Sequence, residues 1–240
     1  MKPAMFASSD EKRTFVQRLF TRIAPRYDWF NRLVSCGQDQ RWRRAALERG
    51  DVRPGQRILD VCAGTGDLSM LCARRQGGAG SVIGLDMNAG MLRCARHKQQ
   101  AARLPIVWVQ GDAEQLPAAT GSVDRVVIGF STRNLSRLDQ GLREMVRVLR
   151  PGGRLIILET GYPSHPILRF GYQLYLLTVA RLIGFLLTGR TWPFTYLARS
   201  VRSFLTPQQM VEALQRVGTE VAYVPLSAGL ASLYLAIKMS

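Results

Sequence analysis

The sequence predicts an α/β protein with a doubly wound, mostly parallel sheet of seven strands, preceded by helices and carrying a helical insertion after the fifth strand. From Arg57 onward, short β-like runs alternate with helical stretches, which is typical of a parallel sheet covered on both faces. An apolar and basic segment then interrupts the alternation. The chain has 240 residues, which suits one domain (1–240) with a proper core and an elaborated edge.

The first segment, residues 10–50, is expected to form a helical cap. Its apolar residues repeat at helical spacing: Phe15, Leu19, Ile23, then Trp29, Phe30 and Leu33. Pro25 and Gly37 interrupt the pattern, so several short helices are predicted instead of one long helix.

Residues 57–160 are expected to form the ligand-binding core of the sheet. The β-like runs are, in order, "RILDVCA", "SVIGLD", "IVWVQGD", "VDRVVIGF" and "GGRLIILE". Helices are predicted between them at 67–76, 89–102 and 139–149. Pro151-Gly152-Gly153 predicts a turn that introduces the fifth strand.

Residues 161–204 differ from the rest in being both apolar and basic. The run 170–187 is nearly long enough for a membrane span, but its internal arginine and glycines argue against one. No acidic residue lies between Glu159 and Glu212, whereas five arginines do. Three interpretations stay open: a core helix with a basic loop, the lid of an apolar pocket, or an interfacial membrane contact.

The last segment, residues 205–240, is expected to complete the sheet. A helix is predicted at 207–217, followed by two strand-like runs, "TEVAYVPL" and "ASLYLAIKM".

The composition limits the classes of molecule that the protein is expected to bind. Thirty-three Lys+Arg against 17 Asp+Glu give a net charge of +16, which favours nucleic acid, a lipid surface or a polyanionic substrate. Four cysteines without paired spacing and two distant histidines predict no disulfide framework and no metal site. The N-terminus has no apolar signal region, so a cytoplasmic setting is the default expectation.

The stretch "ILDVCAGTGDLS" places a glycine-rich turn between a strand and a helix. Gly64 and Gly66 match the first two glycines of a dinucleotide-binding loop, but Ser69 stands where that loop has its third. Asp60 ends the strand and Asp67 begins the helix, and two carboxylates would repel a pyrophosphate. The loop therefore suits a ligand that carries an ammonium or sulfonium cation.

Carboxylates also end the next two strands. Asp86 lies 20 residues after Gly66, where a carboxylate can bind both ribose hydroxyls. Asp112, followed by Ala113, can accept a hydrogen bond from an exocyclic amine such as that of adenine. A cationic amino-acid end, a ribose and an adenine without phosphate describe S-adenosylmethionine. The predicted cofactor contacts are Asp60, Gly64, Thr65, Gly66, Asp86, Met87, Asp112, Ala113 and Gly129.

Further residues carry a resemblance to a known family. The pattern F-x-x-I-A-x-x-Y-D-x-x-N occurs at Phe20, Ile23, Ala24, Tyr27, Asp28 and Asn31, and the pair Trp42-Arg43 follows it. Arg133-Asn134 follows the fourth β-like run, and "LREMVRVLRPGGRLIILE" follows it in turn. With the glycine loop, these residues make the chain similar over nearly its whole length to the menaquinone/ubiquinone C-methyltransferases. The resemblance implies a Rossmann-like class I methyltransferase fold with S-adenosylmethionine as cofactor.

The same resemblance implies a reaction and residue roles. The family methylates a ring carbon of a reduced polyprenylated quinone, as from demethylmenaquinol to menaquinol. Arg133 would stabilise the phenolate or relay its proton through water, and Asn134 would orient the ring. Tyr27 and Asp28 would close the site, with Asp28 a candidate proton acceptor. Structural interpretations stay open for Arg133, as an ion-pair partner at the sheet end, and for Asp28, as a helix cap or partner of Arg26.

The chain departs from the family pattern close to the expected substrate. Gly129 stands where the family usually has a small hydroxyl residue, and Ser131-Thr132 replace a glycine-aliphatic pair before Arg133. Ala63 replaces a glycine of the loop. These departures leave open whether the acceptor is a naphthoquinol, a benzoquinol, or another aromatic or lipid molecule.

Two functions other than quinol methylation are alternatives for this sequence. A nucleic-acid methyltransferase would suit the positive charge, but no RNA-binding module or base-flipping motif is evident, so no nucleic-acid partner is expected. A cofactor-binding protein that has lost catalysis stays open. The expected location is cytoplasmic and peripheral to the inner face of an anionic membrane, and whether the chain forms a homodimer is left open.

Overall fold

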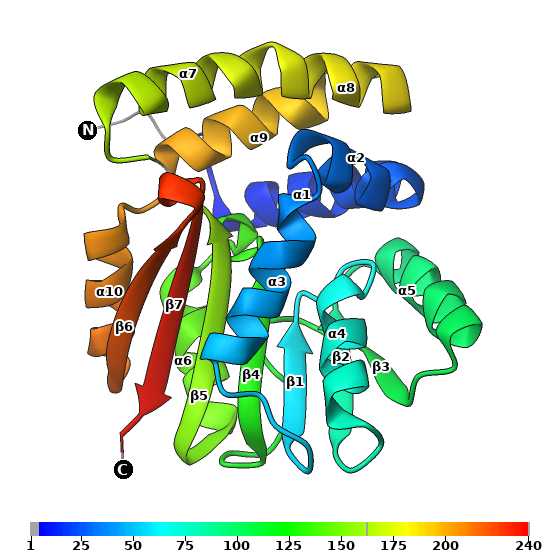
Figure 1. The fold of residues 1–240 in the computed structure, drawn as a ribbon, viewed down its shortest axis with the longest axis vertical. Helices are drawn as coiled ribbons and strands as arrows, with labels where there is room; N and C mark the ends of the chain where they lie inside the picture. Colours follow the sequence, from blue (N-terminus) through cyan, green and yellow to red (C-terminus); the bar gives the residue numbers. More distant parts are fainter. Residues whose placement is uncertain (1–4, 162, 240) are drawn as a thin grey trace.

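The computed structural model of the protein describes residues 5–161 and 163–239, and its centre is a seven-stranded sheet (Figure 1). The strand order is β3-β2-β1-β4-β5-β7-β6. The strands are β1 (Arg57–Val61), β2 (Ser81–Asp86), β3 (Ile106–Gln110), β4 (Val123–Gly129), β5 (Leu149–Thr160), β6 (Thr219–Leu226) and β7 (Ala231–Lys238). β7 is antiparallel to both β5 and β6, and the other pairs are parallel. The prediction of a mostly parallel, seven-stranded, doubly wound sheet is confirmed.

Ten α-helices are found in the described residues. They are α1 (Ser9–Ile23), α2 (Tyr27–Val34), α3 (Gln38–Arg49), α4 (Asp67–Gln76), α5 (Ala89–Ala102), α6 (Leu138–Val148), α7 (Pro166–Leu177), α8 (Val179–Thr188), α9 (Trp192–Ser203) and α10 (Pro207–Arg216). Side chains cap several of them. Ser8 accepts from the Glu11 N–H at the start of α1, and Thr206 and Gln209 form a reciprocal capping box on α10.

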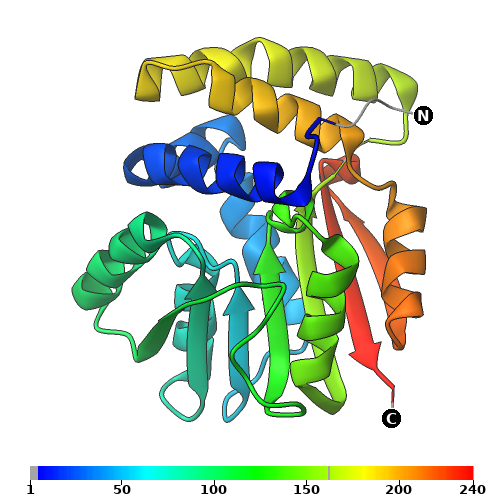
Figure 2. The ribbon, with the colours of Figure 1, turned by 180° about the vertical axis from the view of Figure 1, so that it is seen from behind.

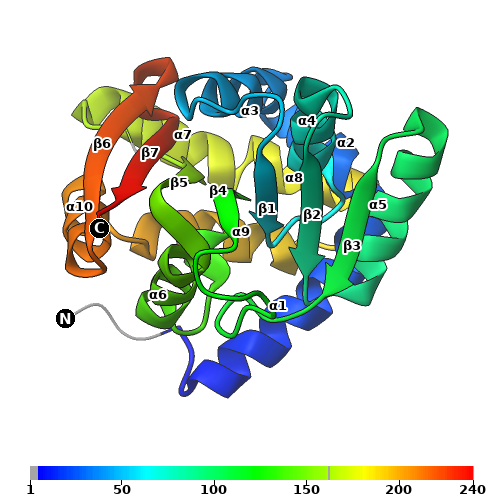
Figure 3. The same cartoon turned by 90° about the horizontal axis from the view of Figure 1, so that it is seen from below.

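The sheet is buried on both faces because alternate residues of its central strands point in opposite directions. Val126 and Ile128 of β4 pack with α6 and α10, whereas Val127 between them packs with α3 and α4. The same alternation separates Leu155 from Ile156 on β5. Figure 3, which views the sheet from below, shows α3 and α4 on one side and α6 on the other.

Helices that precede the core in the sequence and helices that follow it cover the carboxyl edge of the parallel strands. α1 and α2 lie directly above this edge, and α7, α8 and α9 form a further layer over them (Figures 1 and 2). α8 and α9 pack closely, since a Cβ on Gly184 would lie 2.1 Å from the Phe194 ring. The helical cap and the helical insertion expected from the sequence are therefore both present.

α7 and α8 form an almost continuous apolar rod that breaks at Thr178. Within the described residues, Pro166–Thr188 is long and apolar enough to cross a membrane by length and composition, and 17% of its most apolar 18-residue window is buried. Its exposed apolar side chains include Ile167 (77%), Phe170 (70%) and Leu186 (73%).

The start of β5 differs from the prediction. Leu149 pairs with Val123 of β4, and pairing resumes at Arg154 opposite Arg125, so residues 150–153 have no partner on β4. The Pro-Gly-Gly stretch therefore bends the chain inside β5 rather than before it. An irregular strand accommodates the positive φ of Gly152 (70°), as expected for a bulge at the end of a sheet.

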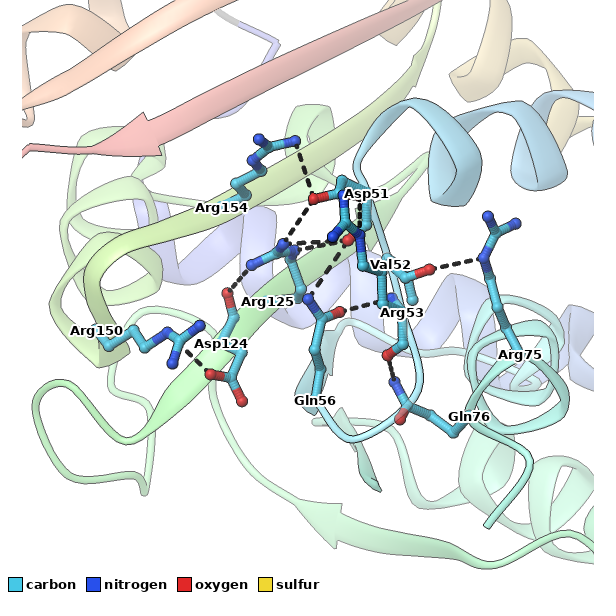
Figure 4. A network of polar contacts seen from close by, with 10 residues as sticks. All are labelled: Asp51, Val52, Arg53, Gln56, Arg75, Gln76, Asp124, Arg125, Arg150 and Arg154. Atoms are coloured by element: carbon cyan, nitrogen blue, oxygen red, sulfur yellow. Dashed lines mark hydrogen bonds and ion pairs between the residues drawn. The ribbon is translucent and has the colours of Figure 1, made fainter. Parts of the chain in front are cut away.

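The amino edge of the sheet carries a network of arginines and aspartates (Figure 4). Arg125 of β4 is 5% exposed and donates to the carbonyl of Asp51 (3.1 Å) and the carbonyl of Asp124 (2.9 Å). Arg150 pairs with the Asp124 carboxylate at 2.9 Å, and Arg154 lies 3.8 Å from the Asp51 carboxylate. This network joins the segment before β1 to β4 and β5.

Candidate active site

The glycine-rich loop after β1 is shaped by its two glycines in different ways. Gly66 has φ of 84°, and a Cβ there would lie 2.5 Å from the ring of Trp108, so this position requires glycine for packing. Gly64 also has a positive φ of 59°, but a Cβ there would meet nothing within 4 Å. The backbone at Gly64 is thus open to a ligand, whereas Gly66 is closed against the core.

A cavity at the carboxyl ends of β1, β2, β3 and β4, called the cofactor-side cavity below, brings together most of the predicted cofactor residues. Those that line it are Gly64, Thr65, Asp86, Met87, Asp112, Ala113 and Gly129. Tyr27 of α2 and Asn134, which follows β4, line it as well. Among the described residues, Asp60 and Gly66 are the two predicted cofactor contacts that do not.

Asp60 lies beneath the loop. Its side chain is buried at 1% exposure and accepts a hydrogen bond from the hydroxyl of Ser69 on α4. Burial raises the pKa of this carboxyl to about 7, although the Ser69 hydrogen bond opposes the shift. Asp67, the first residue of α4, lines the cavity instead.

The carboxylate of Asp86 fixes the loop. It accepts from the N–H of Gly64 and the N–H of Asn88, both at 2.8 Å. Burial raises the pKa of Asp86, and the two backbone hydrogen bonds partly offset that effect. This arrangement holds the carboxylate at the wall of the cavity.

Asp112 is engaged by a residue that sequence reasoning missed. Its carboxylate accepts from the Glu114 N–H at 2.9 Å and forms an ion pair with Arg13 of α1 at 2.7 Å. Because Arg13 belongs to the cap, this pair connects the cap with the strand end.

Asp28 faces the glycine loop and lines neither the cofactor-side cavity nor the apolar cavity described below. Its carboxylate accepts from the Thr65 hydroxyl at 2.5 Å and pairs with Lys98 of α5 at 2.7 Å. Lys98 also pairs with Asp67 at 2.5 Å. Burial alone would raise the pKa of Asp67, but Lys98 and Arg43 hold it below its usual value. Among the described residues, the ion-pair partner of Asp28 is therefore Lys98 and not Arg26.

Arg133 lies in the short helical turn Thr132–Asn134 after β4 and is held by Glu159 of β5. The Glu159 carboxylate is 1% exposed and accepts from the Arg133 guanidinium, the Arg133 N–H and the hydroxyl of Thr132. Arg133 Nη1 also donates to the Phe130 carbonyl at 2.7 Å, while Nε is buried and has no hydrogen-bond partner within residues 5–161 and 163–239. Burial would lower the pKa of Arg133, but Glu159 raises it, so the guanidinium stays charged.

A second, apolar cavity of about 840 Å³ lies between the cap, the insertion and Arg133. Its apolar lining includes Leu19, Ile23, Phe30, Trp42, Phe130, Leu168, Leu176, Phe194 and Leu197. The two cavities share three lining residues, Phe20, Tyr27 and Asn134. Tyr196 donates to Asn134 Oδ1 at 3.0 Å, and Asn134 Nδ2 is buried without a partner. Polar donors therefore lie where the cofactor-side cavity meets an apolar one.

The cofactor-side cavity suits a ligand with a net positive charge. Its lining carries four carboxylates, from Asp67, Asp86, Asp112 and Glu114, and two guanidiniums, from Arg13 and Arg43. S-Adenosylmethionine has two cationic groups and one carboxylate, and its ribose and adenine require acceptors. The open backbone at Gly64 and this donor set fit it. Among residues 5–161 and 163–239, no group of three potential metal ligands is found.

Most of the site residues that the sequence did not predict come from helices outside the alternating core. Arg13, Arg43 and Tyr196 are carried by α1, α3 and α9, whose positions depend on tertiary packing. Arg43 had a sequence signal, because it stands in the Trp-Arg pair that belongs to the family resemblance. The others had none that a single sequence could reveal.

Comparisons with known proteins agree with this geometry. The model of the ubiE/COQ5 methyltransferase family matches residues 6–238. A demethylmenaquinone methyltransferase of Thermus thermophilus is 39% identical over 219 residues, covering 90% of this chain and 98% of that protein. A ubiquinone/menaquinone biosynthesis C-methyltransferase UbiE of Hahella chejuensis is 36% identical, covering 95% and 93%.

Solved structures share the fold at lower identity. The [4+2]-cyclase SpnF superposes with a TM-score of 0.70 at 18% identity and covers 97% of this chain and 96% of its own. An S-adenosylmethionine-dependent methyltransferase from Aquifex aeolicus has a TM-score of 0.62 at 17% identity, covering 81% and 88%. From its family match and its relatives, the chain belongs to the ubiE/COQ5 methyltransferase family and is an S-adenosylmethionine-dependent methyltransferase.

Proposed function

We propose that the protein transfers a methyl group from S-adenosylmethionine to a ring carbon of a reduced polyprenylated quinone, converting demethylmenaquinol to menaquinol. The observation that carries the proposal is the junction of two cavities at Tyr27 and Asn134, one charged and one apolar. A quinol with an isoprenoid tail needs this combination, because its ring must approach a cofactor while its tail stays away from water. The names of the relatives favour a quinone acceptor.

For the cofactor, we assign the ribose to Asp86 and the adenine to Asp112-Ala113. The amino-acid end would then lie along Gly64-Thr65 and Gly129, beside Asp67, which line the remaining part of the cavity. Gly66 and Asp60 act indirectly in this proposal, by shaping the loop from beneath. Met87, which follows Asp86 directly, would contact the nucleoside.

The chemistry requires a nucleophilic ring carbon. When bound, the cofactor supplies an electrophilic methyl group. Loss of the proton from a ring hydroxyl places charge on the neighbouring carbon, which then forms the new C–C bond while the S–C bond breaks. The ring carbon then loses its own proton and the phenolate oxygen regains one, so each turnover releases one proton in net. A cation and aligned donors near the phenolate oxygen lower the barrier to these steps.

Arg133 and Asn134 are the groups we assign to the phenolate. Arg133 Nε and Asn134 Nδ2 are buried donors without a partner, and both residues line the apolar cavity. Glu159 keeps the guanidinium in place and charged, so Arg133 cannot itself accept the proton. Water is therefore the proton acceptor in this proposal.

Tyr27 and Asp28 are assigned to closure of the site. Tyr27 lies at the junction of the cavities, where burial raises the pKa of its hydroxyl and keeps it protonated. Asp28 connects the cap to Thr65 of the loop and to Lys98 of α5. With these partners, Asp28 holds the cap over the cofactor rather than taking the substrate proton.

Enzyme assays test the acceptor. Labelled S-adenosylmethionine and reduced demethylmenaquinol are combined in detergent, and the product is identified by mass. A gain of one methylene that depends on the reductant supports the proposal. Absence of transfer by protein that binds the cofactor would overturn it, and transfer only to a benzoquinol would assign the ubiquinone-type ring instead.

We further propose that residues 161–204 form a lid that places the protein on the inner face of the membrane, from the cytoplasm. Ile167, Phe170 and Leu186 are exposed apolar residues of this segment, and Arg181 and Arg190 are exposed cations in a stretch without acidic residues. Such a face combines apolar insertion with attraction to anionic lipid.

Vesicle flotation tests this attachment. The protein should float with anionic vesicles and less with neutral ones, and the double variant Phe170→Ser, Leu186→Ser should lose flotation. Val107→Ser is the matched control, because Val107 is an exposed apolar residue (61%) on β3, outside the insertion. Equal failure of the unmodified protein to float with both vesicle types would remove the membrane proposal.

A further inference from the structure

Arg43 of α3 is a buried cation at the wall of the cofactor-side cavity. The residue is 5% exposed and lines the cavity together with Thr65, Asp67 and Gly129. Its guanidinium carbon lies 5.0 Å from the centre of the Phe130 ring, a distance typical of a cation–π contact. The guanidinium therefore sits at the end of the cavity assigned above to the amino-acid part of the cofactor.

Its partners do not satisfy it. Asp39, one turn earlier on α3, lies 3.8 Å from Arg43 Nε, beyond hydrogen-bond distance. Asp39 already accepts from the hydroxyl of Ser35 and the amide of Gln40, both at 3.0 Å. Arg43 Nε is buried without a hydrogen-bond partner among the described residues. A buried guanidinium in this state is costly unless a ligand supplies the missing acceptor.

Other cations around the two cavities are differently placed. Arg13 pairs with Asp112 at 2.7 Å, Lys98 pairs with Asp28 and Asp67, and Arg133 pairs with Glu159. Each of these has a carboxylate within hydrogen-bond distance. Arg43 does not, although it lies in the same charged environment.

Gly129 makes the position of Arg43 possible. A Cβ on Gly129 would lie 3.1 Å from Arg43 Nη1, closer than an ordinary van der Waals contact. The departure from the family's small hydroxyl residue at this position thus leaves room for the guanidinium beside the end of β4. The glycine and the arginine together form one wall of the cavity.

We propose that Arg43 binds the α-carboxylate of S-adenosylmethionine. That carboxylate is the cofactor's one anionic group, and a planar guanidinium with free donors matches it geometrically. The acidic Asp67 on the same part of the wall suits the neighbouring ammonium group. Arg43 would thus bind the carboxylate of the amino-acid end, and Asp67 would bind its ammonium group. This inference rests on the cofactor site proposed above and is independent of the acceptor.

Calorimetry with two ligands tests the assignment. S-Adenosylmethionine and decarboxylated S-adenosylmethionine differ in the group that Arg43 should bind. The unmodified protein should bind the carboxylated ligand about 10- to 100-fold more tightly, as expected for a buried, charge-assisted hydrogen bond. Arg43→Met should weaken binding of S-adenosylmethionine by a similar factor and leave the decarboxylated ligand nearly unaffected.

Three controls separate the alternatives. Arg44→Met removes an exposed arginine from the same helix and should change neither affinity. Arg43→Lys keeps the charge and should retain part of the preference, which keeps the test valid if Arg43→Met does not fold. Circular dichroism and thermal unfolding check each variant.

The outcomes distinguish this inference from the proposed function. Equal affinity of the unmodified protein for both ligands would overturn the role of Arg43 alone, and so would an equal loss for both ligands in folded Arg43→Met. Failure of the unmodified protein to bind S-adenosylmethionine at all would instead overturn the cofactor site on which the inference rests.

Discussion

The two ends of β4 carry arginines that the protein uses in opposite ways. At the amino end, Arg125 donates to the carbonyls of Asp51 and Asp124 and lies near the Asp51 carboxylate (Figure 4). Just beyond the carboxyl end, Arg133 has one close carboxylate, Glu159, and a buried Nε without a partner. Every nitrogen of the first guanidinium has an acceptor within the fold, whereas Nε of the second has none among the described residues and lies beside a cavity.

This difference predicts a structural role for Arg125 and a ligand-binding role for Arg133. A buried guanidinium whose donors are all engaged stabilises the segments that it joins. One that retains free donors next to a cavity destabilises the ligand-free protein and gains its missing hydrogen bonds when a ligand arrives. Removing arginines at the two ends should therefore affect different properties.

The largest expected effect is on turnover. Arg133→Met should lower kcat by about 10²- to 10³-fold, because a preorganised donor to the phenolate is lost. The affinity for S-adenosylmethionine should change less than about twofold, since Arg133 lines the apolar cavity and not the cofactor-side one. Turnover and calorimetry measure the two quantities.

A second variant controls for the buried charge that Arg133→Met leaves behind. Arg133→Met leaves the buried Glu159 without its cation, so Arg133→Met, Glu159→Gln is prepared to restore neutrality. Unchanged kcat in either folded variant would show that the two ends of β4 do not differ in function.

The next effect is on stability. Arg125→Met should lower the free energy of unfolding by about 2–4 kcal/mol, because it removes the hydrogen bonds of a buried guanidinium to the carbonyls of Asp51 and Asp124. Urea denaturation measures this loss. Cofactor affinity and kcat should stay as they are, and a large fall in either would contradict a purely structural role for the amino edge.

The comparison also extends to pH. The pKa of Asp60, near the carboxyl end of β1, is raised to about 7 by burial, so the folded protein binds this proton more tightly than the unfolded chain does. Stability should therefore fall as pH rises from about 4 to 7, by about 2–3 kcal/mol between pH 5 and pH 7. Asp60→Asn should remove this slope in urea titrations at several pH values.

Asp51 provides a control of opposite sign. A hydrogen bond from Arg53 holds the pKa of Asp51 below its usual value, so its contribution is present at neutral pH and is lost as pH falls through the lowered pKa. Asp51→Asn should thus reduce stability at neutral pH and matter less in acid. Parallel pH dependences for the two variants would contradict the contrast between the edges.

The smallest effect is expected from Arg150→Ala. Its side chain is 52% exposed and its ion pair with Asp124 is screened by water. The free energy of unfolding should change by less than about 1 kcal/mol. A loss as large as that of Arg125→Met would show that exposure does not distinguish the members of this network.

Much of the fold could be predicted because local patterns and tertiary structure agree. The β-like runs that became β2 and β6 have the bounds expected from the sequence, and the helix expected at 89–102 is α5. The start of β5 was missed, because Leu149 pairs with β4 before the Pro-Gly-Gly stretch, which favours a turn locally and has no partner on β4 itself. The register shift that resolves this conflict depends on the neighbouring strand, which a single segment cannot reveal.

The site was predictable where strand ends define it. Asp86 and Asp112 follow successive parallel strands, so their meeting at one edge follows from the topology. Asp60 also ends a strand, yet it points to the face that α4 covers and bonds to Ser69. The residues contributed by helices, such as Arg43, could not be placed, because the position of a helix over a sheet edge is set by distant packing.

The order of the last two strands has a consequence for how the protein folds. β7 follows β6 in the chain but lies between β5 and β6 in the sheet. Until β7 docks, β6 has no strand to pair with among the described residues. The edge of β5 stays unpaired for the same interval, and an unpaired edge strand is prone to association with other chains. A partly folded chain in which β7 has not yet docked is therefore the species most exposed to aggregation at this edge.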